Sequence, residues 1–192
     1  ILVLAIGIRQ VTVDMGTDRF LVALLSDVEL WMVPLTTFVL AAAVAFATGT
    51  SWGTMGILLP VAIPLAFSLS GGDTLGPDEA GVHLMVVLVG AAVLDGAIFG
   101  DHCSLISDTT VMSSMASSCD HVEHVRTQIP YALVAMIAAA GAGYLLIAHP
   151  DSQVPPWVSY GLGLVFIFGV LRLVGQKVDD EHDHVKEESS PT

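Results

Sequence analysis

The chain of 192 residues is 54% hydrophobic and only 13% charged, with a mean hydropathy of +0.75. A soluble globular domain carries roughly 25% charged residues, so this composition excludes an ordinary soluble domain. The net charge of −13 argues against binding nucleic acid or anionic lipid headgroups, because both need Lys and Arg. Such an acidic, lysine-poor composition is also typical of proteins from salt-accumulating halophiles.

Several apolar runs are long enough to cross about 30 Å of hydrocarbon. The sequence therefore predicts an all-α, polytopic membrane protein with discontinuous helices, broken or re-entrant, in a lipid bilayer. The chain starts at Ile1 inside an apolar run, without the Met and basic flank of a signal peptide. We expect residues 1–175 to be the C-terminal part of a membrane transport domain, whose N-terminal half is missing. Residues 176–192 should form a disordered acidic tail.

Apolar runs alternate with short polar stretches along the chain. The first predicted elements are a helix end (1–13), a segment too short to span (18–26), an apolar run (32–47), a hydroxyl-rich stretch (46–54), a second apolar run (55–69) and a loop (70–79). Next come a span (80–100), a polar interruption (95–110) that overlaps its end, and a short arm (111–118). The last predicted elements are a polar loop (119–128), a span (129–148), a turn (149–156) and a final span (157–174).

The polar interruption at 95–110 carries most of the chemistry. It holds three carboxylates, one imidazole and a run of hydroxyls: Asp95, Asp101, Asp108, His102, Ser104, Ser107, Thr109 and Thr110. Placing one ionisable group in a bilayer costs at least ~2.5–3.5 kcal/mol on insertion scales, so several together indicate an ion or proton path.

Two geometries of this stretch remain open. If it is helical, Asp101, Ser104 and Asp108 share one face, while Asp95 and His102 share another. If it unwinds near Gly100, backbone carbonyls and carboxylates can together coordinate a hard cation such as Na⁺. A carboxylate enclosed by apolar groups also retains a proton more readily, so H⁺ and Na⁺ would compete for it.

Structural roles are the alternative for the same side chains. Asp101 and Asp108 can cap the ends of broken helices by accepting from free N–H groups. Asp95 can form a structural pair, and His102 can either relay protons or simply pack.

The hydroxyl-rich stretch at 46–54 is a second interruption. We expect Thr48, Thr50 and Ser51, with nearby carbonyls, to complete the ion site. The alternative is a glycine-rich packing seam, since small residues let membrane helices approach closely.

Other chemistries find little support. Asp101, His102 and Cys103 are adjacent, so they point in different directions and cannot meet one tetrahedral zinc ion. A hydroxyl cluster in a bilayer is more simply explained by hydrogen bonding to the backbone than by serine hydrolysis, and the chain has no nucleotide-binding P-loop motif. We therefore expect no enzyme, no zinc site and no cofactor.

The few basic residues predict an orientation. Arg126 lies in the polar stretch before one span, and Arg172 and Lys177 border the tail after the next span. All three should lie on the cytoplasmic side of the membrane. This predicts a multi-pass protein of the plasma membrane with a cytoplasmic C-terminal tail.

Three strings resemble the NhaC-type sodium/proton antiporter family of the ion-transporter superfamily. They are F-A-T-G-T-S-W-G-T-M-G-I-L-L-P (46–60), G-D-H-C-S-L-I-S-D-T-T (100–110) and C-D-H-V-E-H-V-R-T-Q-I-P-Y-A (119–132). This chain has Leu105 where members of the family usually have Pro. The resemblance implies a cation/proton antiporter, although the family also contains sodium-coupled exchangers of carboxylates and amines.

These observations together predict Na⁺/H⁺ exchange across the plasma membrane. Asp101 is the expected exchange carboxylate; the expected assisting residues are Asp95, Asp108, Ser104, Ser107, Thr109, Thr50, Ser51 and Thr48. One alternative is a sodium- or proton-coupled exchanger of a small organic solute of the malate/lactate type. Another is a non-transporting membrane subunit. The sequence leaves a homodimer open.

Overall fold

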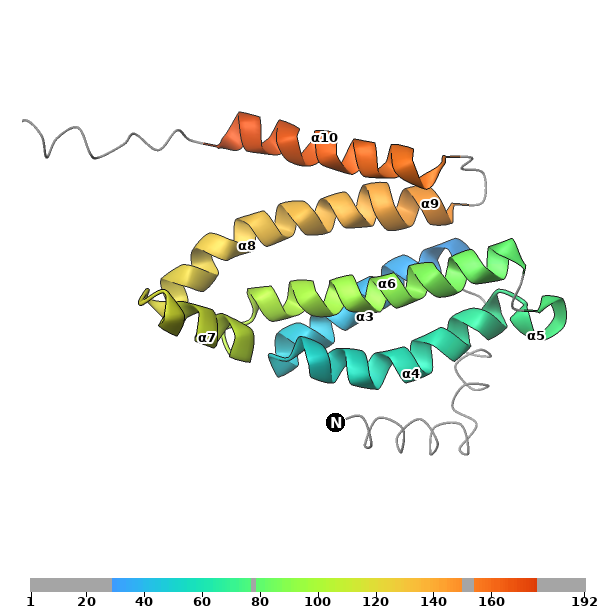
Figure 1. The fold of residues 1–192 in the computed structure, drawn as a ribbon, viewed down its shortest axis with the longest axis horizontal. Coiled ribbons are helices and arrows are strands. Elements are labelled where there is room, and N and C mark those ends of the chain that lie inside the picture. The colour runs from blue at the N-terminus through green and yellow to red at the C-terminus, as the bar shows by residue number, and fades with distance from the viewer. Residues whose placement is uncertain (1–28, 77–78, 150–153, 176–192) are drawn as a thin grey trace, which may run out of the picture.

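The structure, a computed structural model, describes residues 29–76, 79–149 and 154–175, and within these ranges every regular element is a helix (Figure 1). The elements are η1 (Leu30–Met32), α3 (Val33–Thr48), α4 (Ser51–Leu69), α5 (Gly72–Leu75), α6 (Ala80–Cys103), α7 (Asp108–Ala116), α8 (His121–Ala138), the π-helix η2 (Ala139–Leu145), α9 (Leu146–Ala148) and α10 (Pro156–Val174). The predicted segments at 1–13 and 18–26 and the tail at 176–192 lie outside the described residues.

In the described ranges, five helical segments are long and apolar enough to cross a membrane. They are Leu30–Thr48, Ser51–Leu69, Ala80–Cys103, His121–Ala148 and Pro156–Val174. The shortest have 19 residues, which at 1.5 Å per residue gives about 28 Å, close to the thickness of the hydrocarbon core. The prediction of an all-α, polytopic membrane protein is confirmed.

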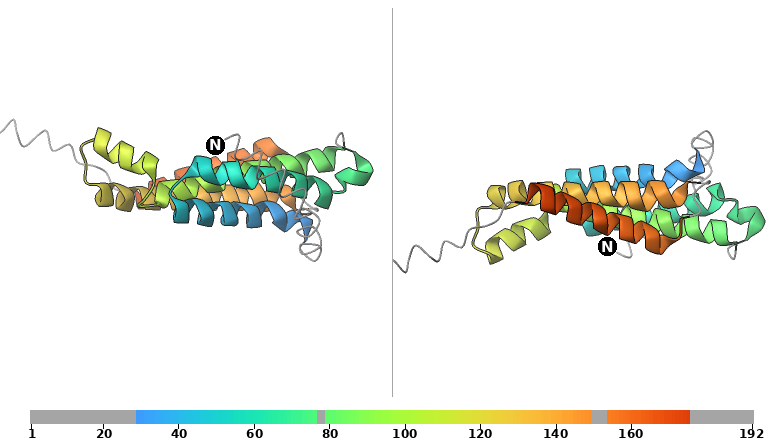
Figure 2. Two further views of the ribbon diagram at one scale, coloured as in Figure 1. Left: turned by 90° about the horizontal axis from the view of Figure 1, so that it is seen from below. Right: turned by 90° about the horizontal axis from the view of Figure 1, so that it is seen from above.

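α6 packs against α3 and α4 and, on another face, against α8 (Figures 1 and 2). α10 packs on α8 and η2 instead. One apolar cluster joins α3, α4 and α6, and a second joins α3, α6 and η2 through Phe38, Leu88, Ala92 and Tyr144. α6 therefore lies between two apolar clusters, one shared with α4 and the other with η2.

Small residues let α3 and α6 come close together. Ala41 and Ala45 of α3 are fully buried, and a Cβ built on Gly100 of α6 would collide with the carbonyl oxygen of Ala42. Such close backbone approach is typical of small-residue interfaces in membranes. It brings the C-terminal ends of α3 and α6 side by side.

The predicted polar loop at 119–128 is wrong, because most of it belongs to α8. Asp120 caps this helix, and its Oδ1 accepts a hydrogen bond from the backbone N–H of Glu123 at 3.0 Å. A capping carboxylate satisfies an N–H that would otherwise lack a partner, so the helix can begin inside a polar sequence. The charged residues of this stretch occupy the first turns of a spanning helix.

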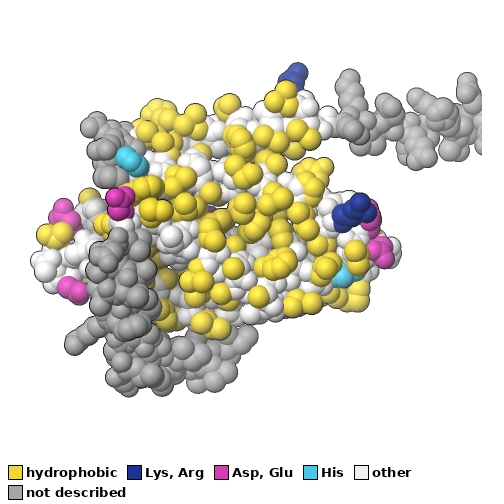
Figure 3. Space-filling view, turned by 180° about the vertical axis from the view of Figure 1, so that it is seen from behind, with side chains coloured by type: hydrophobic (Ala, Val, Ile, Leu, Met, Phe, Trp, Pro, Cys, Tyr) yellow, Lys and Arg dark blue, Asp and Glu magenta, His cyan; other side chains and the backbone are white. Residues whose placement is uncertain are grey.

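On the face shown in Figure 3, hydrophobic side chains are spread over the helices, and charged side chains lie towards the ends. Trp157 and Leu173 of α10, for example, are 74% and 87% exposed. Arg126 lies near the start of α8 and Arg172 near the end of α10. Because these helices run antiparallel, both arginines lie at the same end of the bundle (Figure 1). An apolar belt with charges towards its ends suits a bilayer.

Candidate ion-binding site between two helix breaks

The chain leaves helical geometry between α6 and α7, at Ser104 to Ser107. Ser104 and Ser107 both have extended backbone conformations, and Ser107 caps α7 by accepting from the N–H of Thr110 at 3.3 Å. Capping by a serine favours starting a new helix over continuing α6. The break lies inside the polar interruption, as the unwound alternative predicts.

The second break is the turn between α3 and α4. Gly49 has a φ of +66°, which L-residues rarely adopt, and Thr50 caps α4 by accepting from the N–H of Gly53 at 3.2 Å. A Cβ on Gly49 would lie 2.6 Å from the carbonyl oxygen of Ile106. The absence of a side chain at Gly49 thus allows the two breaks to meet.

Asp101 lies where these breaks meet and is only 2% exposed. Ser107 Oγ donates to its Oδ1 at 2.8 Å, and Thr109 Oγ1 donates to its Oδ2 at 2.6 Å. Ser51, the first residue of α4, donates a longer bond of 3.4 Å to the same Oδ2. One buried carboxylate therefore collects hydroxyl groups from α4, α7 and the break before α7.

Two further contacts fix the shape of the break. Ser104 Oγ donates to the carbonyl oxygen of Phe46 at 2.8 Å, which ties the break to α3. His121 of α8 contacts the carbonyl oxygen of Leu105 through Nε2 at 2.7 Å and Ser114 Oγ through Nδ1 at 3.1 Å. The loop that carries Ser107 is thus held by α3, α7 and α8.

The electrostatics of the site are unusual for a buried acid. Among the described residues, every hydrogen bond to the carboxylate of Asp101 comes from a neutral hydroxyl. The basic side chains of the described ranges lie elsewhere; Arg126, for example, pairs with Glu123 at the surface, at 3.9 Å. Buried charges are ordinarily paired with an opposite charge or a metal ion. The site can therefore accept a cation or a proton.

The structure brings only some of the predicted residues to Asp101. Those in contact are Ser51, Ser107 and Thr109, whereas Thr50 and Ser104 shape the two breaks. Asp108 is exposed and its Oδ1 accepts from the N–H of Thr109 at 2.9 Å. Thr48 is exposed and donates to the carbonyl of Val44.

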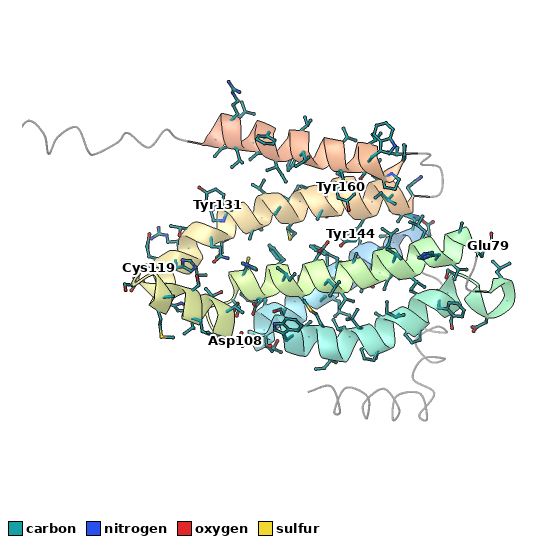
Figure 4. The ribbon with its side chains drawn as sticks, viewed as in Figure 1. Glu79, Asp108, Cys119, Tyr131, Tyr144 and Tyr160 are labelled. Atoms are coloured by element: carbon teal, nitrogen blue, oxygen red, sulfur yellow. The ribbon has the colours of Figure 1, made fainter. Side chains whose placement is uncertain are left out.

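Asp95 and His102 also lie away from this cluster. Asp95 faces η2, where Tyr144 donates to its Oδ2 at 2.6 Å (Figure 4). The Nδ1 of His102, on the exposed side of α6, contacts the carbonyl oxygen of Ile98 at 2.7 Å. Within the described residues, no three His, Cys, Asp or Glu side chains converge on a common point that would suit a metal such as zinc.

Sequence reasoning missed three groups near these acids: the Phe46 carbonyl, Tyr144 and Gln128. The first is a backbone oxygen, and a pattern of side chains does not predict which backbone atoms are in contact. Tyr144 lies 49 residues from Asp95 in the sequence, so no local spacing connects them. Gln128, near the start of α8, lies in a polar stretch, and no other feature of the sequence marks it as a candidate site residue.

Comparison with known proteins places the chain among transporters. The profile of the Na⁺/H⁺ antiporter family matches residues 1–147. An uncharacterized protein of Haemophilus influenzae is 38% identical over 168 residues, which are 87% of this chain and 30% of that protein. The malate-2H⁺/Na⁺-lactate antiporter of Bacillus subtilis is 35% identical over 106 residues, 55% of this chain and 20% of that protein.

A third relative, an uncharacterized Na⁺/H⁺ antiporter of Haemophilus influenzae, is 34% identical over 105 residues, again 55% of this chain and 20% of the relative. The chain thus spans less than a third of the length of each of these relatives. No solved structure matches the chain.

Proposed function

Because the chain belongs to the Na⁺/H⁺ antiporter family, we propose that this multi-pass membrane protein, a secondary transporter, exchanges Na⁺ for H⁺ at Asp101. The observation that carries the proposal is a buried carboxylate that, within the part of the chain that the structure describes, is bonded only by hydroxyl groups. A carboxylate with a basic partner would already be neutralised, whereas this one keeps its charge for a transported ion.

The hydroxyl groups suit both states of the exchange. When Asp101 is ionised and holds no cation, Ser51, Ser107 and Thr109 donate to it. A hydroxyl can rotate its hydrogen away and present a lone pair instead. The same oxygens then become ligands for Na⁺, which prefers oxygen donors as other hard cations do.

A proton on Asp101 excludes Na⁺ by removing the negative charge that attracts it. The two ions then occupy the carboxylate alternately, and this mutual exclusion is what exchange requires. The reaction needs no covalent chemistry, no cofactor and no ATP. We place the protein in the plasma membrane, with the C-terminal tail on the cytoplasmic side near Arg126 and Arg172.

Exchange of a small organic anion is the second candidate, favoured by the name of the Bacillus subtilis relative. An organic carboxylate is ordinarily bound by Arg or Lys. In the described ranges, the basic residues Arg126 and Arg172 are exposed and lie in the first turns of α8 and the last turn of α10. The surroundings of Asp101 therefore suit a bare cation better than an anion.

Transport into everted membrane vesicles tests the proposal, with the protein expressed from its full reading frame. Added Na⁺ should collapse an imposed proton gradient, and Asp101→Asn should reduce this response to background. Glu79→Gln is the matched control, since Glu79 is an exposed acid at the other end of α6. Full activity of Asp101→Asn would remove the central assignment; a malate-dependent, Na⁺-insensitive flux would favour the second candidate.

A further inference from the structure

His121, the first residue of α8, connects the break after α6 with α7. Its Nε2 lies 2.7 Å from the carbonyl oxygen of Leu105 in the break, and its Nδ1 lies 3.1 Å from Ser114 Oγ in α7. Figure 1 shows α7 beside the start of α8. His121 is half-buried, and Ser114 is only 2% exposed. We call these two contacts of His121 the His121 bridge.

The direction of each hydrogen bond in the bridge follows from its acceptor. A carbonyl oxygen only accepts, so Nε2 must carry a hydrogen and donate to Leu105. Ser114 Oγ also lies 2.8 Å from the carbonyl oxygen of Thr110, to which it donates its one hydrogen. It then offers only lone pairs to His121, so Nδ1 must donate as well. An imidazole with a hydrogen on both nitrogens is the charged imidazolium.

The neutral imidazole cannot make all of these contacts. With Nε2 donating to Leu105, Nδ1 has no hydrogen, and the Ser114 hydroxyl must turn away from Thr110 to donate to it. If the hydroxyl does not turn, two lone pairs face each other across 3.1 Å. The imidazolium therefore makes one hydrogen bond more, and bonds of an ionised donor are roughly twice as strong as neutral ones. The bridge is complete only while His121 is charged.

Other charged groups near His121 do not bond to it. The titratable and charged side chains on the surrounding elements are Asp120, Glu123, His124 and Arg126 at the start of α8, Asp108 of α7, Cys119 between these helices, and Asp101, His102 and Cys103 at the end of α6. Among the described residues, none of them makes a hydrogen bond or ion pair with the imidazole. The N-terminus of α8 disfavours a positive charge, whereas the last turn of α7 and the neighbouring Asp120 favour it. The two acceptors of the bridge therefore decide which form fits.

The bridge acts on the carboxylate site through the backbone. It holds both ends of the segment 105–114. Ser107 and Thr109 lie within this segment and donate to the two oxygens of Asp101. His121 makes no hydrogen bond to any of these three residues. Fixing the ends of the segment thus keeps the two hydroxyl groups at the carboxylate.

We propose that His121 is a positioning residue for the Asp101 site, and that protonation of its imidazole fixes the break in the geometry that holds Ser107 and Thr109 at the carboxylate. This inference rests on the proposed function, because it concerns control of the same site. An ordinary imidazole changes charge at about pH 6.5. Below this pH the bridge is complete; above it, the contact with Ser114 is lost or competes with Thr110, and the break loosens.

Deuterium uptake by the purified protein, expressed from its full reading frame, tests the bridge at about pH 6 and about pH 8, after correction for intrinsic exchange rates. The readout is the protection of the backbone N–H groups of residues 104–111. The measurement uses Asp101→Asn, so that titration of Asp101 itself cannot contribute. We expect about tenfold less protection at the higher pH, because the complete bridge adds a hydrogen bond from a charged donor.

Three further substitutions in the same background give the result its specificity. His121→Gln offers an amide donor to Leu105 but cannot become charged, so protection should be low at both pH values. Ser114→Ala keeps the imidazole but removes the acceptor of Nδ1, so it should also abolish the pH dependence. His83→Gln is the matched control, since His83 is exposed in the first turns of α6, and it should keep the full pH dependence. Unchanged protection in the middle of α6 shows that each variant is folded.

Na⁺/H⁺ exchange in everted vesicles connects the bridge to transport, with Asp101 intact. At about pH 6, His121→Gln should raise the Na⁺ concentration for half-maximal exchange several-fold, with little change in the maximal rate. At about pH 8 it should match the wild type, because neither side chain is then charged.

Three results would overturn the proposal. They are protection of the break that does not depend on pH in Asp101→Asn, a pH dependence that survives His121→Gln, and a Na⁺ requirement of His121→Gln at the lower pH that is equal to or below that of the wild type. Full transport activity of Asp101→Asn would remove the exchange proposal but not the pH dependence of deuterium uptake. The two proposals therefore fail separately.

Discussion

Hydroxyl groups, rather than an opposite charge, stabilise the carboxylate of Asp101. The two shorter bonds, at 2.8 Å from Ser107 and 2.6 Å from Thr109, reach different oxygens of the carboxylate. A hydrogen bond to a charged group contributes about 1.5–3 kcal/mol. Removing one hydroxyl should therefore change ion binding measurably without emptying the site.

Thr109→Val tests this contribution because valine has nearly the shape of threonine and lacks the hydroxyl. We expect the Na⁺ concentration for half-maximal exchange to rise about 10-fold or more, from the loss of about 1.5 kcal/mol or more at 1.4 kcal/mol per tenfold.

The control is Thr109→Ser, which restores a hydroxyl at the same position and should behave nearly as the wild type. Both variants are measured in everted vesicles over a range of Na⁺ concentrations and pH. Equal Na⁺ dependence of the valine and serine variants would show that the Thr109 hydroxyl has no part in ion binding.

The three acids of the polar interruption could be found in the sequence, and so could the different faces of Asp95 and Asp101, but the separation of Asp108 from Asp101 could not. Asp95 and Asp101 are six residues apart, and at about 100° per residue a continuous helix puts them on different faces. Asp101 and Asp108 would share a face only if the helix continued, and the Ser107 cap shows that it does not. Whether Asp101 and Asp108 share a face therefore depends on whether tertiary contacts stabilise a continuous helix or a break at Ser107.

The two helix breaks act as one structural unit. The α3–α4 turn contacts the α6–α7 break through Gly49 and Ile106, and Ser104 links the same break to the end of α3. Ser51 reaches Asp101 only because α4 starts at this junction. Close packing of α3 on α6 is therefore a condition for the site.

Gly100→Ala tests this condition at the closest approach of α3 and α6. The added methyl group would collide with the Ala42 carbonyl, and overpacking of this kind costs about 1–3 kcal/mol. We expect a lower melting temperature of the detergent-solubilised protein and a loss of Na⁺/H⁺ exchange.

Gly81→Ala is the matched control, since Gly81 lies in the first turns of the same helix with open space around it. Alanine favours a helix by about 0.8–1.0 kcal/mol over glycine, so this variant should be unchanged or slightly more stable. A Gly100→Ala protein as stable and active as Gly81→Ala would contradict the role of close packing.

The positions of the long helices could be predicted because each is a long apolar run with polar residues at its ends. Two features of α8 and its continuation could not. The polar start of α8 resembles a loop, and only the Asp120 cap makes it helical. The π-helix at Ala139–Leu145 packs on α6 through Tyr144 and on α10, and its small residues, such as Gly141 and Gly143, do not distinguish it from an α-helix in the sequence.

The molecule as a whole places the buried Asp101 and the exposed Asp95 on different sides of α6. Asp101 contacts α4 and α7, while Asp95 contacts η2 and lines a cavity beside α8. The outer faces of α8 and α10 are apolar, as a bilayer requires. Among the described residues, Asp101 is buried and bonded by three hydroxyl groups, whereas Asp95 is exposed and bonded by one, and the exchange proposal depends on that difference.

Proton release on Na⁺ binding tests the exchange at Asp101 without the need for transport. Na⁺ is added to the purified protein, expressed from its full reading frame, in weakly buffered solution, and the pH is followed with an indicator. If Na⁺ displaces a proton from Asp101, the solution acidifies, saturably with Na⁺, for the wild type and Glu79→Gln but not for Asp101→Asn. Equal acidification by Asp101→Asn and the wild type would contradict the proposal.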